Sequence, residues 1–137
     1  MTTKIEARLD LIGIVSADLA ASLDFYRLLG VDIPLGVQDE PHVEVELSSG
    51  LRLAWDTEAT VRSFQPGWAG GRGGRVALAF LLPGPAEVDD AYRVLTAANG
   101  RGEVAPFDAF WGQRYAVLAD PDGNPVELFA PLDSASS

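Results

Sequence analysis

A turn near the C-terminal end constrains the fold more than any other stretch of the 137-residue chain. It reads Asp120-Pro121-Asp122-Gly123-Asn124 and lies between two apolar, β-branched and aromatic runs, residues 115–119 and 126–129. Proline presets φ at the second turn position, glycine accepts a positive φ, and Asp and Asn side chains bond the turn backbone. Pro125 lacks an N–H and can only open the second run. We therefore predict a β-hairpin that is entered through Phe110 and Trp111 and carries Glu127 in its return strand.

The first half of the chain predicts a strand, a helix and three further strands. Residues 9–16 form a short apolar run typical of a strand, and Asp18 is the expected N-cap of a helix that ends at Gly30. Residues 31–37 are expected to form a short edge strand, interrupted by Pro34. Residues 42–47 and 51–56 alternate between apolar and polar, which indicates two strands joined by a turn. Residues 57–63 are expected to form a helical turn.

The same order of elements returns in the second half at a period of roughly 65 residues. A strand over 75–82 precedes a helix over 86–98, and a strand over 103–107 leads into the hairpin. We therefore predict an α+β fold, organised as one domain over residues 1–137. It consists of two βαβββ modules, about 8–63 and about 75–131, joined by a glycine-rich connection over 64–74.

Composition excludes several classes of site and partner. The chain has no cysteine, which excludes disulfides, thiolate nucleophiles and zinc–sulfur sites, and its one histidine, His42, excludes any site that needs two histidines per chain. The formal net charge of −10 repels nucleic acid and attracts cations. No run approaches the ~20 apolar residues of a membrane span, and Met1 to Arg8 lacks a signal-peptide core. We expect a soluble cytoplasmic protein that binds neither nucleic acid nor membrane.

Two motifs resemble those of a known superfamily. They are Ser-Ala-Asp-Leu-Ala-Ala-Ser-Leu-Asp-Phe-Tyr-Arg-Leu-Leu-Gly, residues 16–30, and Trp-Gly-Gln-Arg-Tyr with Asp-Pro-Asp-Gly-Asn-Pro-Val-Glu-Leu, within residues 111–128. Together they resemble the vicinal oxygen chelate superfamily, which includes glyoxalase I, extradiol dioxygenases, fosfomycin-resistance enzymes and bleomycin-resistance binding proteins. The resemblance implies a mixed sheet that curls around one cleft with the helices outside. It also implies a homodimer, because a second subunit commonly completes that cleft.

The resemblance further implies where metal ligands would stand. The metal enzymes of the superfamily use histidines at the positions of Leu11 and Ala77 and a glutamate at the position of Glu127. Only Glu127 has a donor atom here. Because an open catalytic metal site needs three or four protein donors, we expect no metal and no cofactor.

Alternation along the strands predicts a small, apolar inner wall around Glu127, with Phe129 beside it. Trp111 matches the position at which bleomycin-resistance-type proteins present a stacking tryptophan. Trp55 is equally compatible with the core and with the rim of the cleft, and Trp68 lies in a connection that is either a linker or a lid. The predicted ligand-binding residues are Trp111, Glu127, Phe110, Trp55, Trp68, Tyr115, Phe129 and His42.

His42, Glu44 and Glu46 share one face of a strand and allow two interpretations. His42 and Glu46 are roughly 13 Å apart, too far to chelate one ion. The face is either a solvated polar surface or a wall of the cleft whose carboxylates bind a ligand ammonium.

The function predicted from the sequence is metal-free sequestration of a hydrophobic or aromatic small molecule, an antibiotic or aromatic natural product in a self-resistance role, with a cationic ligand as an open possibility. No catalytic residue is required for this function. The alternatives are a lyase or dioxygenase-like enzyme of the same superfamily that uses Glu127 as a general base, and a sensor or accessory domain without chemistry of its own.

Overall fold

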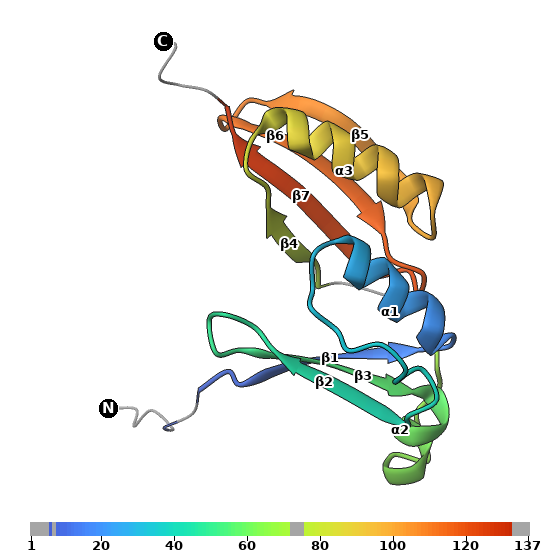
Figure 1. Ribbon diagram of the computed structural model, residues 1–137. Coiled ribbons are helices and arrows are strands. Elements are labelled where there is room, and N and C mark those ends of the chain that lie inside the picture. The colour runs from blue at the N-terminus through green and yellow to red at the C-terminus, as the bar shows by residue number, and fades with distance from the viewer. Residues whose placement is uncertain (1–5, 7, 72–75, 133–137) are drawn as a thin grey trace.

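The computed structural model describes residues 6, 8–71 and 76–132. The element order is β1 (Leu11–Ser16), α1 (Leu19–Leu28), β2 (His42–Glu46), β3 (Arg52–Thr57), α2 (Glu58–Phe64), β4 (Leu78–Leu81), α3 (Pro85–Ala97), β5 (Arg101–Ala109), β6 (Gln113–Ala119) and β7 (Pro125–Pro131) (Figure 1). None of the helices in these ranges is long and apolar enough to cross a membrane.

Two mixed sheets confirm the predicted α+β class. The first has the strand order β1-β3-β2 and the second β4-β7-β6-β5, with β1 and β3, and likewise β4 and β7, running parallel. The two orders match except at one edge, where the second sheet has β5 and the described part of the chain places no strand in the first. The sheets are not closed around a common cleft.

The prediction of a strand over residues 31–37 is wrong, because this segment is irregular. Arg27, in the last turn of α1, donates from Nε to the carbonyl of Ile33 at 3.1 Å and from Nη2 to the carbonyl of Pro34. Pro34 has no N–H to give to a ladder, and Gly36 turns the chain with φ of 81°. The first module therefore has two strands after its helix.

Helix α1 lies between the two sheets (Figure 1). Its N-cap is Asp18, as predicted, whose side chain accepts from the backbone N–H of Ala21. Tyr26 is fully buried and contacts Trp55 of β3 and Phe80 of β4, with ring centroids 5.6 Å and 6.4 Å apart. The sheets thus bury the faces that point toward α1 in one shared core, and their opposite faces point away from each other.

The predicted hairpin is confirmed as β6 and β7, and its turn binds the first module. Oδ1 of Asp120 accepts from the backbone N–H groups of Asp122 and Asn124 at 2.9 Å and 2.8 Å, and Gly123 has φ of 86°. The Tyr26 hydroxyl donates to Oδ2 of Asp120 at 2.7 Å. The backbone N–H of Ala17 donates to Asp122 at 2.9 Å. The turn therefore has two functions: it reverses the chain and it holds the modules together.

The glycine-rich connection has no regular structure over residues 65–71, and residues 72–75 lie outside the described residues. Trp68 is half-buried, and the guanidinium of Arg62 lies 5.1 Å from the centre of its ring. This contact is a cation–π pair with the end of α2.

Candidate functional site

The face of the second sheet that points away from α3 carries the hairpin residues singled out from the sequence. Along β7, Val126, Leu128 and Ala130 are buried, whereas Glu127 and Phe129 alternate with them and are partly exposed. Pairing of the strands places Tyr115 beside Phe129 and Phe107 beside Tyr115. We call this side the open face of the second sheet.

Four aromatic side chains form a cluster at one end of this open face. We define the aromatic cluster as Phe107, Phe110, Trp111 and Tyr115. Their rings meet edge to face, with centroids 5.1 Å to 6.3 Å apart. Phe110 is 97% exposed, Trp111 49% and Phe107 38%. A group of large aromatic side chains left open to solvent is typical of an interaction site.

The turn between β5 and β6 holds Trp111 in this position. Gly112 has φ of 92° and its N–H donates to the carbonyl of Ala109 at 3.0 Å, which closes a tight turn. The indole N–H of Trp111 donates to Oε1 of Gln113 at 2.8 Å. This bond fixes the indole at its edge, and the exposed half of the residue is what a ligand could stack on.

Glu127 lies near Tyr115, which is one of the four residues of the aromatic cluster. Burial raises the pKa of the Tyr115 hydroxyl, and the hydrogen bond and charge of Glu127 raise it further. Arg114, on the neighbouring strand β6, points to the opposite face and pairs with Asp89 at 2.9 Å and Asp108 at 3.0 Å. Within the described residues Glu127 has no ion-pair partner, so its carboxylate is available to a ligand cation.

His42 lies on the open face of the first sheet, inside a chain of hydrogen-bonded charges. Its Nδ1 is 2.6 Å from Asp56 and its Nε2 is 2.9 Å from Glu44, whose other oxygen accepts from Arg52. Hydrogen bonds first to Glu44 and then to Asp56 raise the pKa of His42. Both ring nitrogens face carboxylates, so the charged imidazolium, which donates from both, fits this site best.

The structure does not bring His42 and Trp111 to one surface of a single chain. The two open faces point away from each other, because both buried faces contact α1.

A model of the Glyoxalase/Bleomycin resistance protein/Dioxygenase superfamily matches residues 8–128. The chain belongs to this superfamily. No curated protein matches the chain.

Solved structures of the glyoxalase superfamily share its fold. A family enzyme from Burkholderia phytofirmans PsJN is 20% identical with a TM-score of 0.78, over 92% of this chain and 100% of that one. A glyoxalase-related enzyme from Fulvimarina pelagi is 23% identical with a TM-score of 0.79, over 90% and 87%. Lactoylglutathione lyase from Agrobacterium tumefaciens is 22% identical with a TM-score of 0.62, over 92% and 95%.

The positions at which the glyoxalase superfamily was expected to present metal ligands do not offer a matching donor set here. Leu11 and Ala77 are apolar, and Glu127 pairs across the sheet with Ala79. The pseudo-repeat adds a further position: Ala54 on β3 stands beside Gly13 as Glu127 stands beside Ala79, and it has no donor either. The ranges 8–71 and 76–132 contain no group of three or more acidic or histidine side chains suited to a metal ion. The residues present do not fit the three-ligand site.

The other two predicted tryptophans lie away from the aromatic cluster. Trp55 is fully buried and packs on Tyr26, so it belongs to the core and not to the rim of the cleft. Trp68 lies in the connection beside Arg62 and lines a cavity of about 280 Å³ with Gly13, Val15 and Asn124. Phe107 was not predicted as a site residue, although its position at the end of the expected strand over 103–107 was a usable signal.

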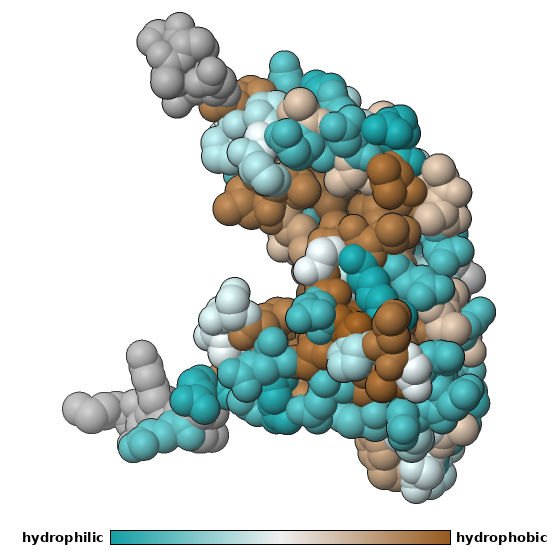
Figure 2. All heavy atoms as spheres, viewed as in Figure 1, coloured by the Kyte–Doolittle hydropathy of each residue, from teal (hydrophilic) through white to brown (hydrophobic). Residues whose placement is uncertain are grey.

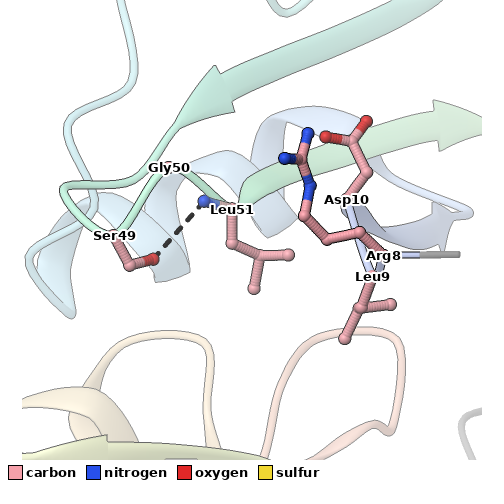
Figure 3. Close-up of a pocket in the computed structure, with 6 residues that line it drawn as sticks. All are labelled: Arg8, Leu9, Asp10, Ser49, Gly50 and Leu51. Atoms are coloured by element: carbon pink, nitrogen blue, oxygen red, sulfur yellow. Dashed lines mark hydrogen bonds between the residues drawn. The ribbon is translucent and has the colours of Figure 1, made fainter. Parts of the chain in front are cut away.

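One further cavity, of about 300 Å³, lies at the end of the first sheet and contains none of the predicted residues. In Figure 3 the side chains of Leu9 and Leu51 point to one side, and the charged groups of Arg8 and Asp10 point to the other. Asp10 is already paired with Arg52. This cavity is separate from the aromatic cluster.

Proposed function

We propose that the protein binds and sequesters a hydrophobic or aromatic small molecule without a metal ion, as the bleomycin-resistance proteins of its superfamily do. The observation that carries the proposal is the aromatic cluster, exposed on an open sheet face with the unpaired carboxylate of Glu127 beside it. Sequestration needs only a fitted surface, so it agrees with a site that lacks a metal donor set.

The chemistry of this surface favours a flat ligand. Indole and phenol rings stack on planar molecules and attract cations at a low cost in conformational entropy. Trp111 supplies the stacking face, and Glu127 supplies one negative charge a short way along the sheet. An aromatic ligand that carries an ammonium group would use both features.

We propose that a homodimer completes the site. The open faces of one chain point apart, and β1 and β4 are edge strands of their sheets. Near β4 the hollow between the sheets is lined by apolar side chains around a cavity of about 420 Å³, and Leu81 is 66% exposed (Figure 2). Such a surface favours a second copy as its cover. The polar open face of one protomer would then adjoin the aromatic open face of its partner.

Enzymatic activity is the second candidate function, favoured by the position of Glu127 on the same sheet face as Tyr115, whose pKa it helps to raise. A carboxylate can act as a general base, and a phenol hydroxyl beside it can orient it by hydrogen bonding. A lactoylglutathione lyase shares the fold. In this alternative Glu127 removes a proton from a bound substrate.

Calorimetric titration with flat aromatic natural products, cationic and neutral, tests the binding proposal. We expect one site per chain, and Trp111→Ala should weaken binding roughly 2- to 12-fold, the value of stacking beyond area burial. Phe64→Ala is the matched control, because Phe64 is also an exposed aromatic residue and lies on α2, outside the aromatic cluster. An affinity that is unchanged in Trp111→Ala contradicts the proposal. The presence of about one transition metal ion per purified chain also contradicts it. Consumption of a bound compound that Glu127→Gln abolishes supports the enzyme instead.

Light scattering tests the dimer. A mass of about twice the 14.6 kDa chain is expected at micromolar concentration. Recovery of the single-chain mass would refute it.

A further inference from the structure

The outer edge of β2 has no strand beside it among the described residues. The second sheet is ordered β4-β7-β6-β5, and the first is ordered β1-β3-β2, so the place that β5 takes in the second module is open in the first. This comparison within one chain identifies a sheet edge with room for one more strand.

The backbone of β2 offers hydrogen bonds at this edge. The N–H of Leu47 donates to Leu51 and the N–H of Thr57 donates to Pro41, so the odd-numbered residues of β2 bond to β3. In an antiparallel pair the residues between them point their N–H and C=O groups the other way. The backbone groups of His42, Glu44 and Glu46 therefore face outward.

A hollow of about 430 Å³ adjoins this edge. Residues 29–32 line it on one side and residues 45–49 on the other, and Phe80 closes it toward the second sheet. The chain's own segment 31–37 does not fill the edge, because Arg27 holds the carbonyls of Ile33 and Pro34. The hollow therefore stays open because segment 31–37 is irregular and does not form the predicted strand.

Side chains around the edge define the composition of a strand that would fit. Glu44 and Glu46 point to the open face, and Asp32 lines the hollow; Glu46 and Asp32 have no ion-pair partner within ranges 8–71 and 76–132. On the other face Val43 and Val45 are buried or half-buried. Added side chains alternate between these two faces, so basic residues would meet the carboxylates and apolar residues would meet the valines.

We propose that the outer edge of β2 binds an extended peptide segment of alternating basic and apolar residues as an added strand. Main-chain bonds to His42, Glu44 and Glu46 provide affinity, and Glu46 with Asp32 selects positive charge. A second copy of this chain is a poor occupant, because antiparallel pairing of two β2 edges over their full length would set Glu44 against Glu44. The site is distinct from the aromatic cluster and does not depend on its ligand.

Amide hydrogen exchange with a synthetic peptide tests the proposal. The probe is an acetylated heptapeptide of alternating lysine and valine, and the controls are a glutamate–valine peptide and a lysine–valine peptide with a central proline. We expect the amides of His42, Glu44 and Glu46 to exchange slowly only with the first peptide. The amides of Val43 and Val45 should be protected throughout, since they bond to β3. Binding should weaken as salt is raised.

Charge reversal separates recognition from sheet stability. Glu46→Lys should weaken peptide binding about tenfold, because an attraction becomes a repulsion. Glu103→Lys, on the edge strand β5 of the other sheet, is the matched control and should leave it unchanged. Equal binding of the glutamate–valine peptide, unprotected amides in all three complexes, or protection of these amides by self-association without peptide would each overturn the proposal.

Discussion

The hydroxyl of Tyr26 joins the two modules, and Tyr26→Phe measures that bond alone. The hydroxyl donates to Asp120, which is 2% exposed, at 2.7 Å across 94 residues of sequence. Burial and the neighbouring aspartates raise the pKa of Tyr26 well above its ordinary value, so the hydroxyl stays protonated over the working pH range. Phenylalanine preserves the ring contacts with Phe25, Trp55 and Phe80.

A hydrogen bond to a charged partner contributes about 1.5–3 kcal/mol. Asp120 keeps its bonds from Asp122 and Asn124 in the variant, so its carboxylate is not left without donors. We therefore expect the low end of that range, a loss of about 1.5 kcal/mol from the free energy of unfolding and of roughly 5 °C in melting temperature. Tyr26→Ala, which also removes the ring, should cost about 3–5 kcal/mol.

Urea unfolding followed by circular dichroism is the assay, with Tyr92→Phe as the matched control. Tyr92 on α3 is partly buried, but its hydroxyl makes no hydrogen bond to the described residues. A lower midpoint at constant slope for Tyr26→Phe, and no shift for Tyr92→Phe, is the expected result. Equal midpoints for the two variants would refute the argument that this bond stabilises the docking of the modules.

Three further variants test other parts of the structure. Glu127→Gln should lower affinity for a cationic aromatic ligand, measured by calorimetry, while affinity for a neutral analogue and stability stay nearly unchanged; normal binding of the cation dismisses the role of its charge. His42→Asn should remove a stabilising contribution that is fully present below the unfolded pKa of about 6.5 and is lost as pH rises through the raised folded pKa; a constant difference in unfolding free energy from pH 5 to 9 contradicts this. Gly100→Ala would place a Cβ 2.8 Å from Leu118 and 2.9 Å from the carbonyl of Leu95, so we expect a loss of about 1–3 kcal/mol, and an unchanged melting temperature is the contrary result.

The local elements of the fold were predictable because short-range chemistry determines them. Asp120 accepts hydrogen bonds from the backbone of its own turn, and Pro125 begins β7 because proline has no N–H for a position inside a strand. Asp18 caps α1 through a bond to a residue only three positions away. In each case the residues that decide the conformation are neighbours in the sequence.

The candidate site was predictable in part. Trp111, Phe110, Tyr115, Glu127 and Phe129 share one hairpin; strand alternation puts Glu127 and Phe129 on one face, and the register of the hairpin adds Tyr115. Phe107 joined them because the pairing of β5 with β6 places it opposite Tyr115, a register that the sequence did not specify. The placement of Trp55 depended on which face of β3 meets α1, and alternation cannot choose between the two faces.

The sequence by itself determined the superfamily, the two modules and the position of nearly every helix and strand, since periodicity and turn chemistry are local properties. Only the tertiary structure decided that residues 31–37 stay irregular, because their carbonyls are taken by Arg27 from the preceding helix. It also decided that α1 lies between the sheets, which separates the aromatic face from the face of His42. Contacts such as that of Tyr26 with Asp120 link residues 94 positions apart, and no local pattern specifies which distant groups will meet.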